Sequence, residues 1–142
     1  MAKGYATTLT QVKAILDGID AAVMPIKFAY FETMPTQLPA GYVLIRGGQP
    51  ERAVDTSNNE VTVSVLILAI FAPEESSGAA LKWAQILDAI TDAFRLESNR
   101  TLGGNAHNVE IGDAQQTVSA EFGMPALVCS VRLTAKMLKS TQ

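Results

Sequence analysis

The residues of this sequence that could carry out chemistry are few and stand apart from one another. Asp88 and Asp92 are one helical turn apart, a spacing that can pair two carboxylates for acid–base catalysis. His107 is the only histidine and Cys129 the only cysteine, so a two-histidine metal site, a cysteine metal cluster and an intrachain disulfide are all excluded. We interpret the aspartates as a solvated helix face, His107 as a loop residue and Cys129 as a small apolar strand residue.

The glycine pairs are the remaining candidates for a ligand site. Gly47-Gly48 and Gly103-Gly104 lack the further glycine spacing of the dinucleotide fingerprint, and neither is followed by the Gly-Lys-Ser/Thr of a P-loop. The sequence therefore offers no cradle for phosphate. We predict no catalytic residue, no cofactor and no metal ion, and we expect that the protein is not an enzyme.

The composition indicates one globular domain over residues 1–142. A chain of 142 residues with 48% apolar and 18% charged residues is long enough for one core and too short for two. Its eleven lysines and arginines are scattered among fourteen aspartates and glutamates, for a net charge of −3. Because no basic stripe exists, tight nucleic-acid binding is not expected. The low charge content favours buried interfaces.

No segment predicts secretion or a membrane span. The first ten residues lack the run of about seven apolar residues that a signal sequence needs. The longest uninterrupted apolar run, Val65 to Ala72, is far shorter than the roughly 20 residues that cross a bilayer. We expect a protein made in a reducing cytoplasm, without a membrane partner.

The segment Asn59 to Pro73 predicts the central strand of the fold. Its first half alternates valine with threonine and serine at the two-residue period of a half-buried strand. Its second half, Leu66 to Phe71, has no polar face. We therefore expect one face of the first half to be solvated and the second half to be covered on both sides.

The other elements follow from periodicity and from turn residues. Thr8 and Gln11 have the spacing of a capping box, and apolar residues recur at helical intervals up to Pro25. Beyond this helix we predict strands at 26–31 and 42–46, a polar loop at 47–58, a helix over 79–97, and strands at 109–111, 117–122 and 127–133. Short connections favour antiparallel pairing. The predicted class is α+β, with a mostly antiparallel sheet of about 4–6 strands and two amphipathic helices packed on one face.

This arrangement resembles the tail terminator, or tail-completion, proteins that form part of the neck of long-tailed bacteriophages. The resemblance covers nearly the whole chain and consists of patterns and spacings rather than one invariant motif. The matching features are the N-terminal helix with Leu9, Val12, Ile15, Leu16 and Ile19, the strand Pro39 to Ile45, the polar loop, the apolar strand ending at Ala72-Pro73, the helix with Ala80-Leu81, Ile86-Leu87 and Ala89-Ile90, the Leu102-Gly103 step, and the last strand Ala126 to Leu138.

The resemblance implies a structural virion protein. A member of this family assembles as a hexameric ring on the last ring of tail-tube protein, stops tube growth, and presents its other face to the head-side neck or connector protein. DNA passes through the lumen without specific binding. A chain without excess basic charge is compatible with this passage, since cationic walls would hold the phosphates. The family has no catalytic residues to transfer to this sequence.

We predict protein contacts at five residues. Glu51, Arg52 and Asp55 lie in the 47–58 loop and Arg46 directly precedes it; their mixed charges are suited to setting the register against a neighbouring protomer or the tube. Trp83 widens the apolar stripe of the second helix, which indicates either the edge of the core or a subunit contact.

Several alternatives stay open. The 47–58 loop is equally compatible with a mobile hairpin tip, and Lys136 to Gln142 with a frayed tail or a ring contact. The protein could also be another head–tail connector or a tail-tube subunit. A more remote alternative is a small cytoplasmic enzyme or ligand-binding domain that uses Asp88, Asp92 or His107.

Overall fold

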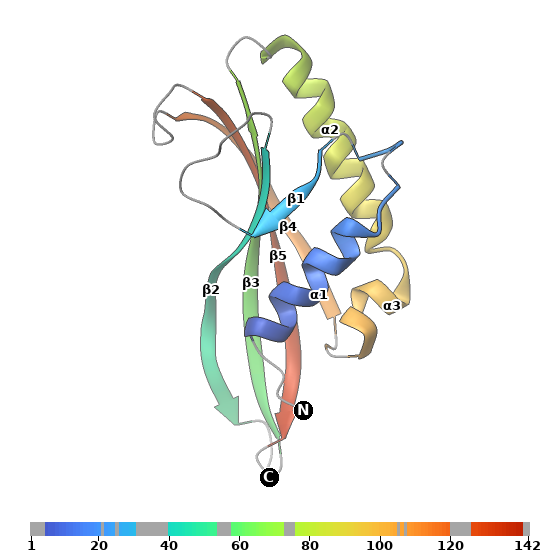
Figure 1. Ribbon diagram of the computed structural model, residues 1–142. Coiled ribbons are helices and arrows are strands. Elements are labelled where there is room, and N and C mark those ends of the chain that lie inside the picture. The colour runs from blue at the N-terminus through green and yellow to red at the C-terminus, as the bar shows by residue number, and fades with distance from the viewer. Residues whose placement is uncertain are drawn as a thin grey trace.

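The protein has an α+β fold in which helices cover one face of a five-stranded sheet (Figure 1). The computed structural model describes residues 5–20, 22–24, 26–30, 40–53, 58–72, 76–104, 106, 108–119 and 126–140. The predicted fold class is confirmed, with two long helices and a short third helix on the same side of the sheet.

The sheet has the strand order β1-β2-β3-β5-β4. The strands are β1 (Phe28–Tyr30), β2 (Ala40–Ala53), β3 (Asn58–Phe71), β4 (Asn108–Ser119) and β5 (Ala126–Ser140). All neighbours pair antiparallel except β1 and β2, which are parallel. The order of β5 and β4 inserts the last strand of the chain beside β3, so that β3 is hydrogen-bonded on both edges along its length.

The parallel pair β1–β2 depends on a glycine. Phe28 pairs with Gly41, and a Cβ atom at Gly41 would lie 2.7 Å from the Lys27 carbonyl oxygen and 2.8 Å from Cδ1 of Phe28. Distances this short do not occur for a real Cβ atom, so any other residue would push β1 away from β2. Glycine is therefore needed here for close approach rather than for a special backbone angle.

The predicted central strand is confirmed as β3. Its odd-numbered residues from Val61 to Phe71 face the helices and are buried. On the other face, Leu68 and Ile70 form a separate buried cluster with Tyr42 of β2. The two-sided burial predicted for the apolar half is confirmed from Ile67 to Phe71, whereas Leu66 is partly exposed. The solvated face predicted for the first half is wrong at Thr62, which is buried, because this short side chain lies between two neighbouring strands.

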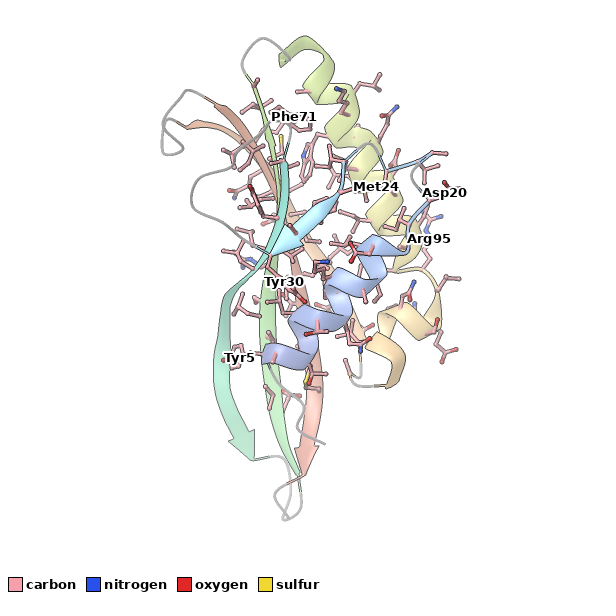
Figure 2. All side chains as sticks on the ribbon, viewed as in Figure 1. Tyr5, Asp20, Met24, Tyr30, Phe71 and Arg95 are labelled. Carbon is pink, nitrogen blue, oxygen red and sulfur yellow. The ribbon has the colours of Figure 1, made fainter. Side chains whose placement is uncertain are left out.

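Two helices make the core with the covered face of the sheet. They are α1 (Tyr5–Asp17) and α2 (Ser76–Ala93). Val12 and Leu16 of α1 and Ile86 and Ile90 of α2 join one buried cluster with β3 and β5. Figure 2 shows side chains filling the space between the helices and the sheet. Each fully buried side chain of this kind contributes about 1.5–3 kcal/mol, so this layer is the main source of stability.

The predicted start and end of the first helix are both wrong. The helix begins at Tyr5, and Thr8 lies inside it rather than at its N-cap. The buried Thr8 hydroxyl instead lies 3.9 Å from the sulfur of Met137. The helix ends at Asp17 and not near Pro25, since Gly18 follows and Asp20 accepts a hydrogen bond from the Ala22 amide in a local turn.

The strands near the C-terminus differ from the prediction in number and length. Residues 109–111 and 117–119 of the two predicted segments belong to one strand, β4, and residues 120–122 lie outside the described part of the chain. An irregularity between Ile111 and Ala114 lets one extra residue bulge out. β5 continues to Ser140, paired with β3, so a frayed tail is excluded for 136–140. Residues 141–142 lie outside the described part of the chain. Regular hydrogen bonding to β3 overrides the weak local pattern.

The connection after α2 contains α3 (Glu97–Arg100) and the 3-10 turn η2 (Leu102–Gly104). Gly103 has φ +67°, a left-handed conformation that glycine adopts without strain, as expected for a glycine after a helix. Leu102 is buried at a positive φ of 49°, which directs its side chain into the core. Within the described segments, none of the helices has the length and apolarity that a bilayer crossing requires.

Candidate interaction surfaces

The polar loop predicted at 47–58 is in fact strand at residues 47–53 and at Asn58, and residues 54–57 lie outside the described part of the chain. Residues 46–53 of β2, 58–60 of β3 and 138–140 of β5 continue as paired strands, and we call these three segments the hairpin extension. Figure 1 shows these strands running on past the start of α1. The loop prediction is wrong because β3 and β5 provide a hydrogen-bonding template. That template holds a segment rich in glycine and polar residues in strand conformation.

Two bulges in β2 accommodate its extra residues relative to the paired part of β3. Between Ile45 and Gly47 the register against β3 shifts by one residue, which makes Arg46 the extra residue of a bulge. A second shift between Gln49 and Arg52 contains Pro50, and bulges and edge strands are the places where a sheet accepts proline. The bulges increase the local twist and re-aim this end of the strand.

Three of the five predicted contact residues lie in the hairpin extension. Arg46 and Glu51 lie in β2, and Arg52 is opposite Glu60 of β3 in the register. Asp55 falls outside the described residues. Trp83 is elsewhere: it is 3% exposed and belongs to the main core. We correct the subunit-contact interpretation of Trp83, because a side chain buried this deeply has no surface to offer a partner.

The sheet has two edges with open stretches. On its outer side β2 pairs with β1 only from Gly41 to Val43, and among the described residues no strand covers it from Leu44 to Ala53. β4 forms the other edge and pairs, in the described part of the chain, only with β5. Such edges carry backbone donors and acceptors that can pair with another chain.

The face of the sheet opposite the helices is mixed in character. Arg132 and Lys136 of β5 and Glu110 of β4 are exposed there. The cluster of Tyr42, Leu68 and Ile70 lies at the other end of the same face. We call this surface the open face.

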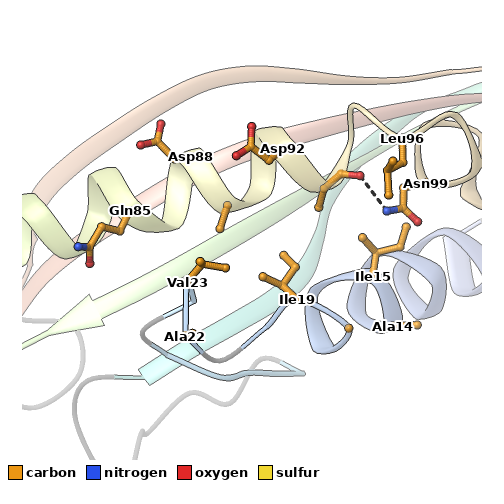
Figure 3. A pocket seen from close by; sticks show the side chains of 13 residues that line it. Ala14, Ile15, Ile19, Ala22, Val23, Gln85, Asp88, Asp92, Leu96 and Asn99 are labelled. Atoms are coloured by element: carbon orange, nitrogen blue, oxygen red, sulfur yellow. Dashed lines mark hydrogen bonds between the residues drawn. The ribbon is translucent and has the colours of Figure 1, made fainter.

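A groove lies between α1 with the turn that follows it and the second half of α2, and we call it the helix groove. Its volume is about 970 Å³. Figure 3 shows Ile15, Ile19 and Val23 along one side, with Asp88 and Asp92 on the opposite helix. The complete lining is Ala14, Ile15, Gly18, Ile19, Ala22, Val23, Gln85, Asp88, Ala89, Asp92, Ala93, Leu96 and Asn99.

Sequence reasoning missed this groove although it placed two of its residues correctly. Asp88 and Asp92 are exposed on a helix face, as predicted. Val23 was assigned to the buried stripe of the first helix, but that helix ends at Asp17 and Val23 is 55% exposed. No local signal identifies the groove, because it arises from how two helices 60 or more residues apart lie on the sheet.

The described residues show little reactive chemistry. Cys129 is fully buried in β5, and this burial raises the pKa of its thiol to about 11. A buried thiol with a raised pKa is a poor nucleophile. Three or more histidine, cysteine, aspartate or glutamate side chains do not gather at any one point of the described chain. His107 lies outside the described residues.

Comparison of the chain with models of known protein families found no match, and comparison with curated proteins found none either. The fold and its surfaces are therefore interpreted from their own geometry.

Proposed function

We propose that the protein is a structural component of a phage tail. It forms a hexameric ring on the last ring of tail-tube subunits, ends tube polymerisation, and joins the tail to the head-side neck proteins in the virion. In this role it is not an enzyme, and DNA passes through the ring without specific contacts. The sequence resemblance to tail terminator proteins is the origin of the proposal.

The open sheet edges support an assembly function most directly. In the described part of the chain, β2 from Leu44 to Ala53 and the whole of β4 have free outer edges on opposite sides of one sheet. A contact between two different edges is heterologous, and repeated heterologous contacts close into a ring when the rotation between subunits allows it. The hairpin extension lengthens the β2 edge and carries Arg46, Glu51 and Arg52 to it.

A ring is tested first by mass and shape. Six copies of the 15.1 kDa chain make about 91 kDa (6 × 15.1), which light scattering coupled to size exclusion measures directly and negative-stain images visualise. Members of the resembling family can be monomeric before assembly, so the measurement is repeated with purified tail tubes. Binding at one tube end is the expected result, and decoration along the tube wall contradicts the proposal.

A charge reversal in the hairpin extension tests the proposed contact. Arg46→Glu is expected to weaken ring formation or tube capping, because it reverses a charge at the free edge. Arg100→Glu in α3 makes the same change at an exposed site outside the hairpin extension and serves as the control. Thermal melts of both variants show whether either one fails to fold. If both variants cap tubes equally well, the hairpin extension does not take part in the interface.

The function itself is tested in a phage that lacks the gene. Tails of abnormal length that fail to attach to heads are expected, and normal tails on normal particles would refute the proposal. A tail-tube subunit would use the same free edges differently. It would polymerise by itself into long tubes, so that outcome assigns the protein to the tube rather than to its end.

A further inference from the structure

We propose that the helix groove is a docking site for an amphipathic helix of a partner protein, with lysine or arginine residues beside its apolar stripe. This inference concerns the helix-covered side of the molecule. It does not depend on the ring, which the sheet edges would form.

The groove has an apolar lining that the described residues of the protomer leave partly exposed. Val23 and Leu96 are 55% and 59% exposed, and both line the groove together with the half-buried Ile15 and Ile19. A single exposed apolar side chain needs no explanation, but four lining one hollow make a contiguous apolar surface. A volume of about 970 Å³ is enough for the anchoring side chains of a partner segment.

The spacing of the lining residues matches a helix as the occupant. On α2 the lining residues recur every three or four positions from Gln85 to Ala93, and Leu96 lies just beyond the end of this helix. On the other side Ala14 and Ile15 lie on α1, and the lining residues from Gly18 to Val23 lie in the turn that follows it. α2 therefore presents one helical ridge along the groove, against which a further helix can pack. From Gln85 to Asp92 the groove follows α2 for about 10 Å, or two helical turns. Partner helices that bind in grooves use anchors at this spacing.

The charge of the groove selects a basic partner. Asp88 and Asp92 lie on its rim, and no lysine, arginine or histidine is among its lining residues. Arg95 contacts Asp92 at 3.3 Å, but both side chains are well exposed, and an exposed pair of this kind is weak enough to exchange for a partner's cation. A basic residue beside the apolar stripe of the incoming helix would meet these carboxylates, which favours one orientation and a faster encounter.

The floor of the groove argues against a small polar ligand. Asn99 is the one partly buried polar side chain of the lining, and its amide donates to the Ala93 carbonyl oxygen at 2.8 Å. Its donor is thus engaged within the protomer. Small-molecule sites fix their ligand with a few inward polar groups, whereas here the charged groups lie only at the rim.

A model peptide tests the proposal with the full-length protein. The probe is a fluorescein-labelled peptide of 18 leucines and lysines, about five turns of helix, with leucine at positions i, i+3, i+4 and i+7. The control is a peptide of the same composition in scrambled order. Fluorescence anisotropy is expected to show binding of the amphipathic peptide at least about tenfold tighter than the scrambled one, a difference of about 1.4 kcal/mol. Equal binding of the two peptides would overturn the proposal.

Matched variants then locate the site. Val23→Ser with Leu96→Ser is expected to weaken binding about tenfold or more, whereas Leu81→Ser leaves it unchanged, because Leu81 is 66% exposed on α2 but does not line the groove. Asp88→Lys with Asp92→Lys should weaken binding similarly and abolish its salt dependence. Glu110→Lys with Asp113→Lys makes the same charge change on exposed β4 residues as the control.

Two outcomes would contradict the site. If the groove variants and their controls lose peptide binding equally, the peptide binds by non-specific charge attraction and not in the groove. A fall in the assembly mass of the unliganded protein caused by the groove variants alone would show that a second copy of this chain occupies the groove. Arg46→Glu would leave peptide binding intact in either case, so failure of the ring proposal and failure of this one are distinguishable.

Discussion

The two faces of the central strand β3 differ in what covers them. Its odd-numbered residues pack beneath α1 and α2 in one large cluster, and every one of them from Val61 to Phe71 is buried. On the open face only Leu68, Ile70 and Thr62 are buried, while Ser64 and Leu66 are partly exposed. One strand thus supplies the core on one side and a partly exposed surface on the other.

Under the function that we propose, this difference separates the residues that stabilise the fold from those available for assembly. The covered face holds the helices and so positions the helix groove, whereas the edges and the open face contribute less to folding and are available for contacts. Neighbouring residues of β3 point to opposite faces of the sheet. Substituting two neighbours therefore compares how much each face contributes to stability.

The largest expected effect is on the covered face. Ile67→Ala removes a fully buried side chain between sheet and helices and is expected to lower the free energy of unfolding by about 3–5 kcal/mol. Leu66→Ala, one residue away and partly exposed on the open face, should cost about 1 kcal/mol. Urea denaturation measures both values. Similar losses for the two variants would show that both faces are equally covered.

A second pair of variants compares two positions within the open face. Leu68→Ala is expected to cost about 2–3 kcal/mol, since Leu68 is 7% exposed in the small cluster with Tyr42 and Ile70. Thr62→Ala should cost about 1 kcal/mol, because the lost methyl group was buried without joining either apolar cluster. Denaturant unfolding monitored by circular dichroism ranks them. A larger loss at Thr62 than at Leu68 would contradict the placement of the cluster.

Two glycines test how tightly the covered side is packed. Gly41→Ala places a methyl group against Lys27 and Phe28 and is expected to destabilise the protein by about 1–3 kcal/mol. Gly78→Ala in α2 meets nothing within 4 Å and should stabilise it by about 0.5–1 kcal/mol, since alanine favours the helix. Thermal melts of the two variants should shift in opposite directions. Shifts in the same direction would show that β1 is held loosely.

The last comparison concerns the pH dependence contributed by Cys129 on the covered face. Because the folded thiol has a pKa raised from 9.0 to about 11 by burial, its contribution to stability is complete below pH 9 and is lost as the pH rises toward 11. Unfolding free energies at pH 8 and pH 10.5 should therefore fall more steeply for the natural chain than for Cys129→Ala. Identical pH profiles would mean that the thiol is accessible to water in the native state.

Several elements were predictable because their signals are local. The apolar run of β3 and the amphipathic pattern of α2 identify their elements within a few residues, and Gly103 has the left-handed conformation that a glycine after a helix often adopts. The α+β class follows from these elements and their order. The exposed Asp88 and Asp92 were likewise placed on the correct face of α2.

Two of the errors come from strand pairing with distant residues. Gly47 to Ala53 reads as a loop but is held as a strand by β3, and residues 136–140 read as a tail but pair with residues 58–62. Trp83 has the pattern of either core or interface, and only the packing of α2 on the sheet places it in the core. Thr8 has the spacing of a cap, yet the helix starts three residues before it.

The sequence by itself determined the class of the fold, its central strand and its second helix, since hydrophobic periodicity acts over neighbouring residues. Tertiary structure alone decided that the last strand enters the sheet beside β3, that two edges stay open and that a groove forms between α1 and α2. These features depend on which strands pair with each other and on how the helices pack on the sheet. Such contacts join residues far apart in the chain, so no local pattern specifies them.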